Sequence, residues 1–112
     1  MKIKQVQLRK LIQEVIAGTN KVVYNSDYGG FGLSKAGKEL YKQLSGQEFQ
    51  DYDAVRHDPF LVQVVEQLGK RANGSHAALK IATIRGDKYK IEEYDGAEGV
   101  VEPEDINWVV IQ

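Results

Sequence analysis

The stretch Asp58-Pro-Phe-Leu-Val-Gln-Val-Val-Glu-Gln-Leu68 carries the clearest structural signal in the chain. Asp58 can cap a helix N-terminus with its carboxylate, and Pro59 suits the first helical position, where no backbone hydrogen bond is lost. Apolar residues then recur at helical spacing, at Phe60, Leu61, Val64, Val65 and Leu68. This pattern predicts an amphipathic helix that begins at Asp58 and is ended by the pair Asn73-Gly74.

Two more helices are predicted on the N-terminal side of this stretch. Met1–Ala17 places apolar side chains at three- and four-residue intervals and is followed by a glycine, which is typical of a helix end. Ser34 is a suitable N-cap for a second helix that reaches about Leu44 and is closed by Gly46. Gly37 is expected to weaken that helix by roughly 1 kcal/mol relative to alanine.

The remaining apolar segments are typical of strands. β-Branched and aromatic residues favour a pleated surface, and glycine with asparagine or aspartate favours tight turns. The predicted strands are Lys21–Asn25, Ala78–Ile84, Tyr89–Tyr94 and a run around Trp108–Ile111, with turns at Gly86-Asp87 and Asp95-Gly96. The last three strands are expected to form an antiparallel meander. The fold class is therefore α+β, a small antiparallel sheet packed against about three helices.

Composition limits the classes of protein that this chain can be. With 112 residues, 42% hydrophobic and 28% charged, we expect a single domain over residues 1–112. The net charge of −1 favours neither nucleic acid nor a membrane surface. The absence of cysteine excludes disulfides and suits a reducing compartment, and nothing in the sequence resembles a signal peptide or a transmembrane segment. We therefore expect a cytoplasmic protein.

The glycine-rich segment Asp27-Tyr-Gly-Gly-Phe-Gly-Leu-Ser34 is the sharpest candidate site. It lies between a predicted strand and a predicted helix N-terminus, where free N–H groups and the helix dipole can hold a phosphate or a carboxylate. It matches neither the dinucleotide-binding pattern nor the Walker pattern. The alternative interpretation is a tight turn that places Phe31 in the core.

Arg56-His57 could add charge to the same site, although Arg56 could instead pair with one of the many acidic residues. Tyr28 or Phe31 could stack on a ring. The predicted ligand-binding residues are Tyr28, Gly29, Gly30, Phe31, Gly32, Ser34, Arg56 and His57. No metal, cofactor or catalytic residue is predicted, because the two histidines lack a zinc-binding spacing, the acids lack a calcium-loop spacing and no serine lies in a nucleophile elbow.

The order of these motifs resembles a known family. Tyr28-Gly-Gly-Phe-Gly-Leu-Ser34 is followed by Arg56, Asp58-Pro59, Leu79-Lys80-Ile81 and Glu93-Tyr94-Asp95-Gly96. This series, from Lys21 to Gly96, is similar to a family of small uncharacterised proteins of tailed bacteriophages, large DNA viruses and their bacterial relatives. The resemblance implies a phage or viral origin, hence the host cytoplasm. The family has no established reaction, so no catalytic residue is implied.

Two functions follow as hypotheses, and an enzyme ranks third. The first is a non-catalytic protein that binds a small anionic metabolite, a nucleotide or another phosphate-bearing molecule, and that sequesters or senses it in a host cell. The alternative is a protein-interaction module that binds itself or a host protein. The apolar run Trp108-Val-Val-Ile111 favours pairing with a second copy, so a homodimer is expected under this alternative.

Overall fold

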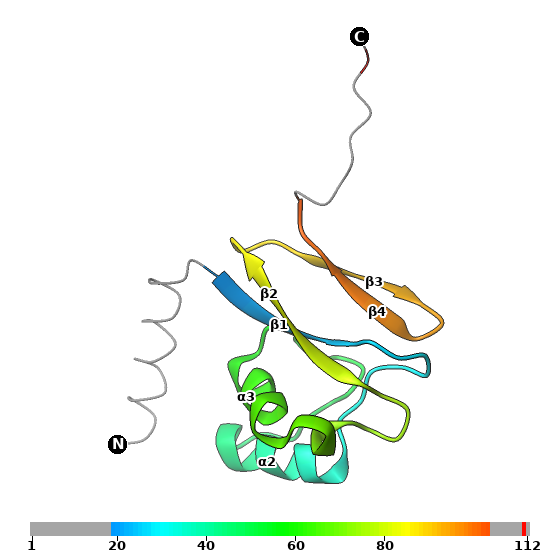
Figure 1. Cartoon of the computed structure of the whole chain (residues 1–112). Helices are drawn as coiled ribbons and strands as arrows, with labels where there is room; N and C mark the ends of the chain where they lie inside the picture. Colours follow the sequence, from blue (N-terminus) through cyan, green and yellow to red (C-terminus); the bar gives the residue numbers. More distant parts are fainter. Residues whose placement is uncertain (1–18, 104–110, 112) are drawn as a thin grey trace.

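The computed structural model describes residues 19–103 and residue 111. Its elements are strand β1 (Thr19–Asn25), helix α2 (Lys35–Ser45), helix α3 (Pro59–Leu68), the 3-10 helix η1 (Gly69–Ala72) and strands β2 (Leu79–Arg85), β3 (Lys90–Tyr94) and β4 (Ala97–Val101). Over these residues the fold is α+β, as predicted, with two α-helices and two small antiparallel sheets (Figure 1). The predicted helix Met1–Ala17 lies outside the described residues, and so does the predicted strand around Trp108–Ile111 apart from Ile111.

The strand pairing differs from the predicted meander. β1 pairs with β2, with Val23 opposite Ile81, and β3 pairs with β4, with Glu93 opposite Glu98. The predicted pairing of β2 with the following strand is therefore wrong. The reason lies in the turns: Asp95 and Gly96 both have positive φ, 51° and 89°, which gives the twist that a two-residue hairpin requires. Residues 86–89 instead form a wider connection between the two sheets.

Both described helices begin where the sequence predicts. Ser34 accepts the Gly37 N–H at 3.0 Å, and Asp58 accepts the Phe60 N–H at 2.9 Å ahead of Pro59. α3 ends earlier than predicted, at Leu68, because the next residue is a glycine at φ 57° and the chain continues as η1.

Gly37, expected to weaken α2, is buried in a crowded place. A Cβ added there would lie 3.2 Å from Leu33 Cδ2 and 3.4 Å from the Ala72 carbonyl oxygen. Its small size therefore lets α2 pack closely against η1, and this close packing is a reason for glycine inside the helix.

The hydrophobic core lies between the two helices and one face of the β1–β2 pair, and the β3–β4 hairpin lies on the other side (Figure 1). Its buried members are Val23, Leu33, Tyr41, Phe49, Leu61, Val62, Val64, Val65 and Ala72. Leu61 and Val64, from the predicted apolar stripe of α3, are fully buried. Phe49 anchors the long loop between the helices through an edge-to-face contact with Tyr41, at 5.0 Å between ring centroids.

The hydroxyl of Tyr41 joins α2 to the start of α3. It donates a hydrogen bond of 2.6 Å to Asp58 Oδ2. Burial, with a smaller contribution from the Asp58 carboxylate, raises the pKa of Tyr41 to about 12. Because the folded-state pKa lies above the unfolded value, the folded protein holds a proton that the unfolded chain releases, and stability falls as the pH rises from about 10 through about 12.

We expect Tyr41→Phe to flatten this alkaline loss of stability, which is about 3 kcal/mol in the wild type. At pH 8 the variant should be less stable by about 1 kcal/mol, since Asp58 loses a hydrogen bond. Urea unfolding at several pH values measures both effects. Tyr28→Phe, on an exposed side chain, is the matched control; equal alkaline slopes for Tyr41→Phe and the wild type would contradict the assignment.

Candidate functional site

The glycine-rich segment lies against the turn of the β3–β4 hairpin. The Gly29 N–H donates to the Asp95 carbonyl at 3.3 Å. A Cβ on Gly96 would lie 2.6 Å from the Gly30 nitrogen, and one on Gly29 would lie 2.7 Å from His76 Cβ. These contacts leave no room for side chains. Gly96 allows the hairpin turn to approach the Gly29-Gly30 backbone, and Gly29 allows the approach of the segment that contains His76.

Asn25, at the end of β1, holds this junction together and was not among the predicted site residues. Its side chain is fully buried. The amide nitrogen donates to the carbonyls of Asp27 and Gly96, at 2.7 and 2.8 Å, while Oδ1 accepts the Ala78 N–H at 2.8 Å. A polar residue that ends an apolar strand is the sequence signal that could have pointed to it.

Arg56 is paired within the protein. Both of its terminal nitrogens donate to the Glu98 carboxylate, and the two side chains are only 17% and 8% exposed. Glu98 also accepts the Asn25 backbone N–H at 2.9 Å. The guanidinium lies over the Phe31 ring, 3.7 Å from its centroid. The sequence suggests that the positive charge of Arg56 binds a ligand, but in the structure this charge is already balanced by the Glu98 carboxylate.

The N-terminus of α2 is also met by a carboxylate of the chain itself. Asp51 accepts the Leu33 N–H at 3.2 Å and pairs with Lys38 at 3.1 Å. Ser34 is engaged as well, because its hydroxyl caps α2 and donates to the Arg71 carbonyl. At this end of the helix an external anion would compete with Asp51.

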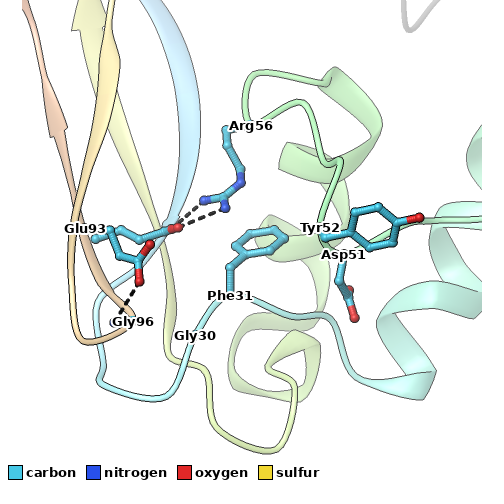
Figure 2. Close-up of a pocket in the computed structure, with 8 residues that line it drawn as sticks. Gly30, Phe31, Asp51, Tyr52, Arg56, Glu93 and Gly96 are labelled. Atoms are coloured by element: carbon cyan, nitrogen blue, oxygen red, sulfur yellow. Dashed lines mark hydrogen bonds and ion pairs between the residues drawn. The ribbon is translucent and has the colours of Figure 1, made fainter.

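A pocket of about 210 Å³ lies where these segments meet (Figure 2). It is lined by Gly30, Phe31, Asp51, Tyr52, Arg56, Glu93, Gly96 and Glu98. Figure 2 shows Phe31 in the centre, with Arg56 above it, Glu93 on the hairpin side and Tyr52 on the opposite side. Three predicted site residues, Gly30, Phe31 and Arg56, are thus brought together.

The other predicted site residues do not line this pocket. Gly29, Gly32 and Ser34 are held in backbone and capping contacts, and the Tyr28 side chain is largely exposed. His57 lies beside Tyr89, with 2.7 Å between Nδ1 and the hydroxyl oxygen. Burial raises the pKa of Tyr89, against an opposing effect of the Arg56 charge.

The charge of the pocket lining is negative. Three carboxylates, of Asp51, Glu93 and Glu98, line the pocket together with one guanidinium, that of Arg56. Asp51 is also paired with Lys38, which does not line the pocket. Glu93 and Glu98 are directly opposite each other across the hairpin. Two like charges in this position repel each other and destabilise the strand pair. Arg56 compensates Glu98, while Glu93 accepts the Gly96 N–H at 3.1 Å. The pocket therefore favours a group that donates hydrogen bonds or carries positive charge over a phosphate.

Two absences hold for the residues that the structure describes. No group of three or more acidic or histidine side chains among them could hold a metal ion. No described helix is long and apolar enough to cross a membrane.

The chain was also compared with known proteins. No protein-family model, curated protein or solved structure matches it.

Proposed function

We propose that this protein is a non-catalytic binding protein for a small ligand that occupies the pocket at Phe31. The observation that carries the proposal is the convergence of aromatic and charged groups on one cavity from three segments: the glycine-rich segment, the loop between α2 and α3, and the β3–β4 hairpin. Its volume of about 210 Å³ is below the roughly 300–1,000 Å³ of drug-sized ligand sites, so it suits a single ring system such as a nucleobase, or a group of amino-acid size.

The side chains at the pocket favour a planar ring that carries N–H donors. Tyr52 is 85% exposed, so its ring face is open for stacking. Asp51 and Glu93 can accept hydrogen bonds from amino groups on the ring. A phosphate would face these same carboxylates and would have to share Arg56 with Glu98. A nucleoside-like molecule thus suits the site better than the phosphate-bearing ligand that the sequence suggests.

The protein-interaction alternative, with its homodimer, stays a second proposal. It rests on the run Trp108–Ile111, most of which lies outside the described residues. A role in sequestering or sensing a host metabolite likewise depends on the resemblance to viral proteins.

Calorimetry tests the binding proposal by comparing each nucleoside with its own monophosphate. The nucleosides are adenosine, guanosine and cytidine. We expect a nucleoside to bind more tightly than its monophosphate. Tyr52→Ala should weaken binding by about 1–3 kcal/mol, the range for loss of one stacked base. Tyr28→Ala, on an exposed tyrosine outside the pocket, should not.

Two other outcomes are informative. A tighter monophosphate would overturn the ligand class while retaining a binding protein. If the panel is extended to amino acids and polyamines and none of its compounds binds, the proposed function is contradicted.

A further inference from the structure

The pocket is built from two parts of the molecule. The part from β1 to β2, here called the body, supplies Gly30, Phe31, Asp51, Tyr52 and Arg56. The β3–β4 hairpin supplies Glu93, Gly96 and Glu98. In the described part of the chain, no hairpin residue belongs to the hydrophobic cluster around α2 and α3. The hairpin therefore forms one wall of the pocket without being part of the main core.

The joint between β1 and the hairpin is made by side chains. β1 uses one edge to pair with β2. On its other edge the Val23 N–H donates to the Arg56 carbonyl at 2.8 Å, and the Asn25 N–H donates to the Glu98 carboxylate at 2.9 Å. Since a carboxylate takes the place of a backbone carbonyl here, opening this contact breaks no hydrogen-bonded ladder. It does break the hydrogen bonds from Asn25 Nδ2 to the Gly96 carbonyl and from the Gly29 N–H to the Asp95 carbonyl.

We propose that Glu98 is an internal ligand of Arg56, that it latches the β3–β4 hairpin as a lid over the pocket, and that phosphate-type anions release this latch. Nη1 and Nη2 of Arg56 form a fork that Glu98 occupies, and this fork matches one carboxylate or one phosphate group in bidentate geometry. An anion that binds this fork thus displaces Glu98. The lid equilibrium shifts by the difference in affinity of the anion for the open and the closed states.

Amide hydrogen exchange measured by NMR on the full chain tests the latch, with inorganic pyrophosphate as the probe and sodium chloride at equal ionic strength as the reference. The Asn25 and Gly29 amides donate to the hairpin, so we expect them to exchange several-fold faster in pyrophosphate. The Val23 amide, on the same edge of β1, donates to the body and should be unchanged. Equal behaviour of Asn25 and Val23 would overturn the proposal.

A pair of charge-matched variants gives a second, independent readout. Glu98→Gln keeps the shape and removes the charge, so its Asn25 and Gly29 amides should exchange faster than in the wild type without pyrophosphate. Calorimetry should show that it binds pyrophosphate at least tenfold more tightly. Glu92→Gln changes the same charge on the same hairpin, where Glu92 pairs with Lys90 away from the pocket, and should resemble the wild type.

If Glu98→Gln and Glu92→Gln behave alike, Glu98 is not a latch. This result would leave the proposed binding of a nucleoside-like ligand standing, because neither readout uses an organic ligand. Conversely, the latch can be demonstrated even if the nucleoside panel shows no binding.

Discussion

Gly96→Ala is expected to destabilise the protein by about 2–5 kcal/mol, whereas Gly86→Ala should cost only about 1–2 kcal/mol. Both glycines have positive φ, 89° and 76°, so both substitutions carry the conformational cost of a left-handed residue. They differ in space: a Cβ at Gly96 would lie 2.6 Å from the Gly30 nitrogen, and one at Gly86 would meet nothing within 4 Å. The difference measures the contact between the hairpin turn and the glycine-rich segment.

Urea unfolding of the two variants beside the wild type provides the measurement. Equal losses of stability would mean that the hairpin turn does not press on the Gly29-Gly30 backbone. A large loss for Gly96→Ala alone would establish this contact as a constraint on the fold.

Asn25→Ala is expected to cost about 3 kcal/mol or more, because several buried polar groups lose their partners together. The Ala78 N–H and the carbonyls of Asp27 and Gly96 all bond to this side chain. Asn73→Ala is the matched control: the Asn73 side chain accepts one backbone N–H, from Leu79 at 2.9 Å, so its loss should cost about 1 kcal/mol.

The free energy of unfolding of Asn25→Ala and of Asn73→Ala can be measured by urea melts and compared with that of the wild type. Asn25→Asp adds a useful intermediate, since it retains the acceptor for Ala78 but loses both donors. Costs for Asn25→Ala no larger than those for Asn73→Ala would contradict a structural role for Asn25 in joining β1, the glycine-rich segment and the hairpin.

The parts of the fold that could be predicted are those specified by neighbouring residues. Ser34 and Asp58 cap the helices that follow them within three residues, and Gly46 ends α2 through a local backbone conformation. Strand pairing is not local in this sense. β2 pairs with β1 across the whole helical region, and the sequence pattern does not predict β4, because Glu98 and Gly99 interrupt its apolar residues.

The residues of the candidate site also divide into those that the sequence can predict and those that depend on distant contacts. Gly30, Phe31 and Arg56 stand out by residue type, so they could be chosen from the sequence. The partner of Arg56 lies 42 positions away and reaches it only because the hairpin docks beside β1. Glu93 reaches the pocket by the same docking, and Asp51 and Tyr52 come from a loop without helical or strand periodicity. Their roles depend on tertiary contacts that no local pattern reports.

The Arg56 carbonyl and the Glu98 carboxylate have one further consequence, which concerns solubility. An unpaired strand edge is a template for strands of other chains and so a starting point for aggregation. On β1 the outward N–H groups of Val23 and Asn25 are already bonded to these two acceptors, which blocks such pairing in the folded protein. Loss of the Glu98 carboxylate would uncover part of that edge, and the protein would then lose protection against intermolecular β-sheet formation.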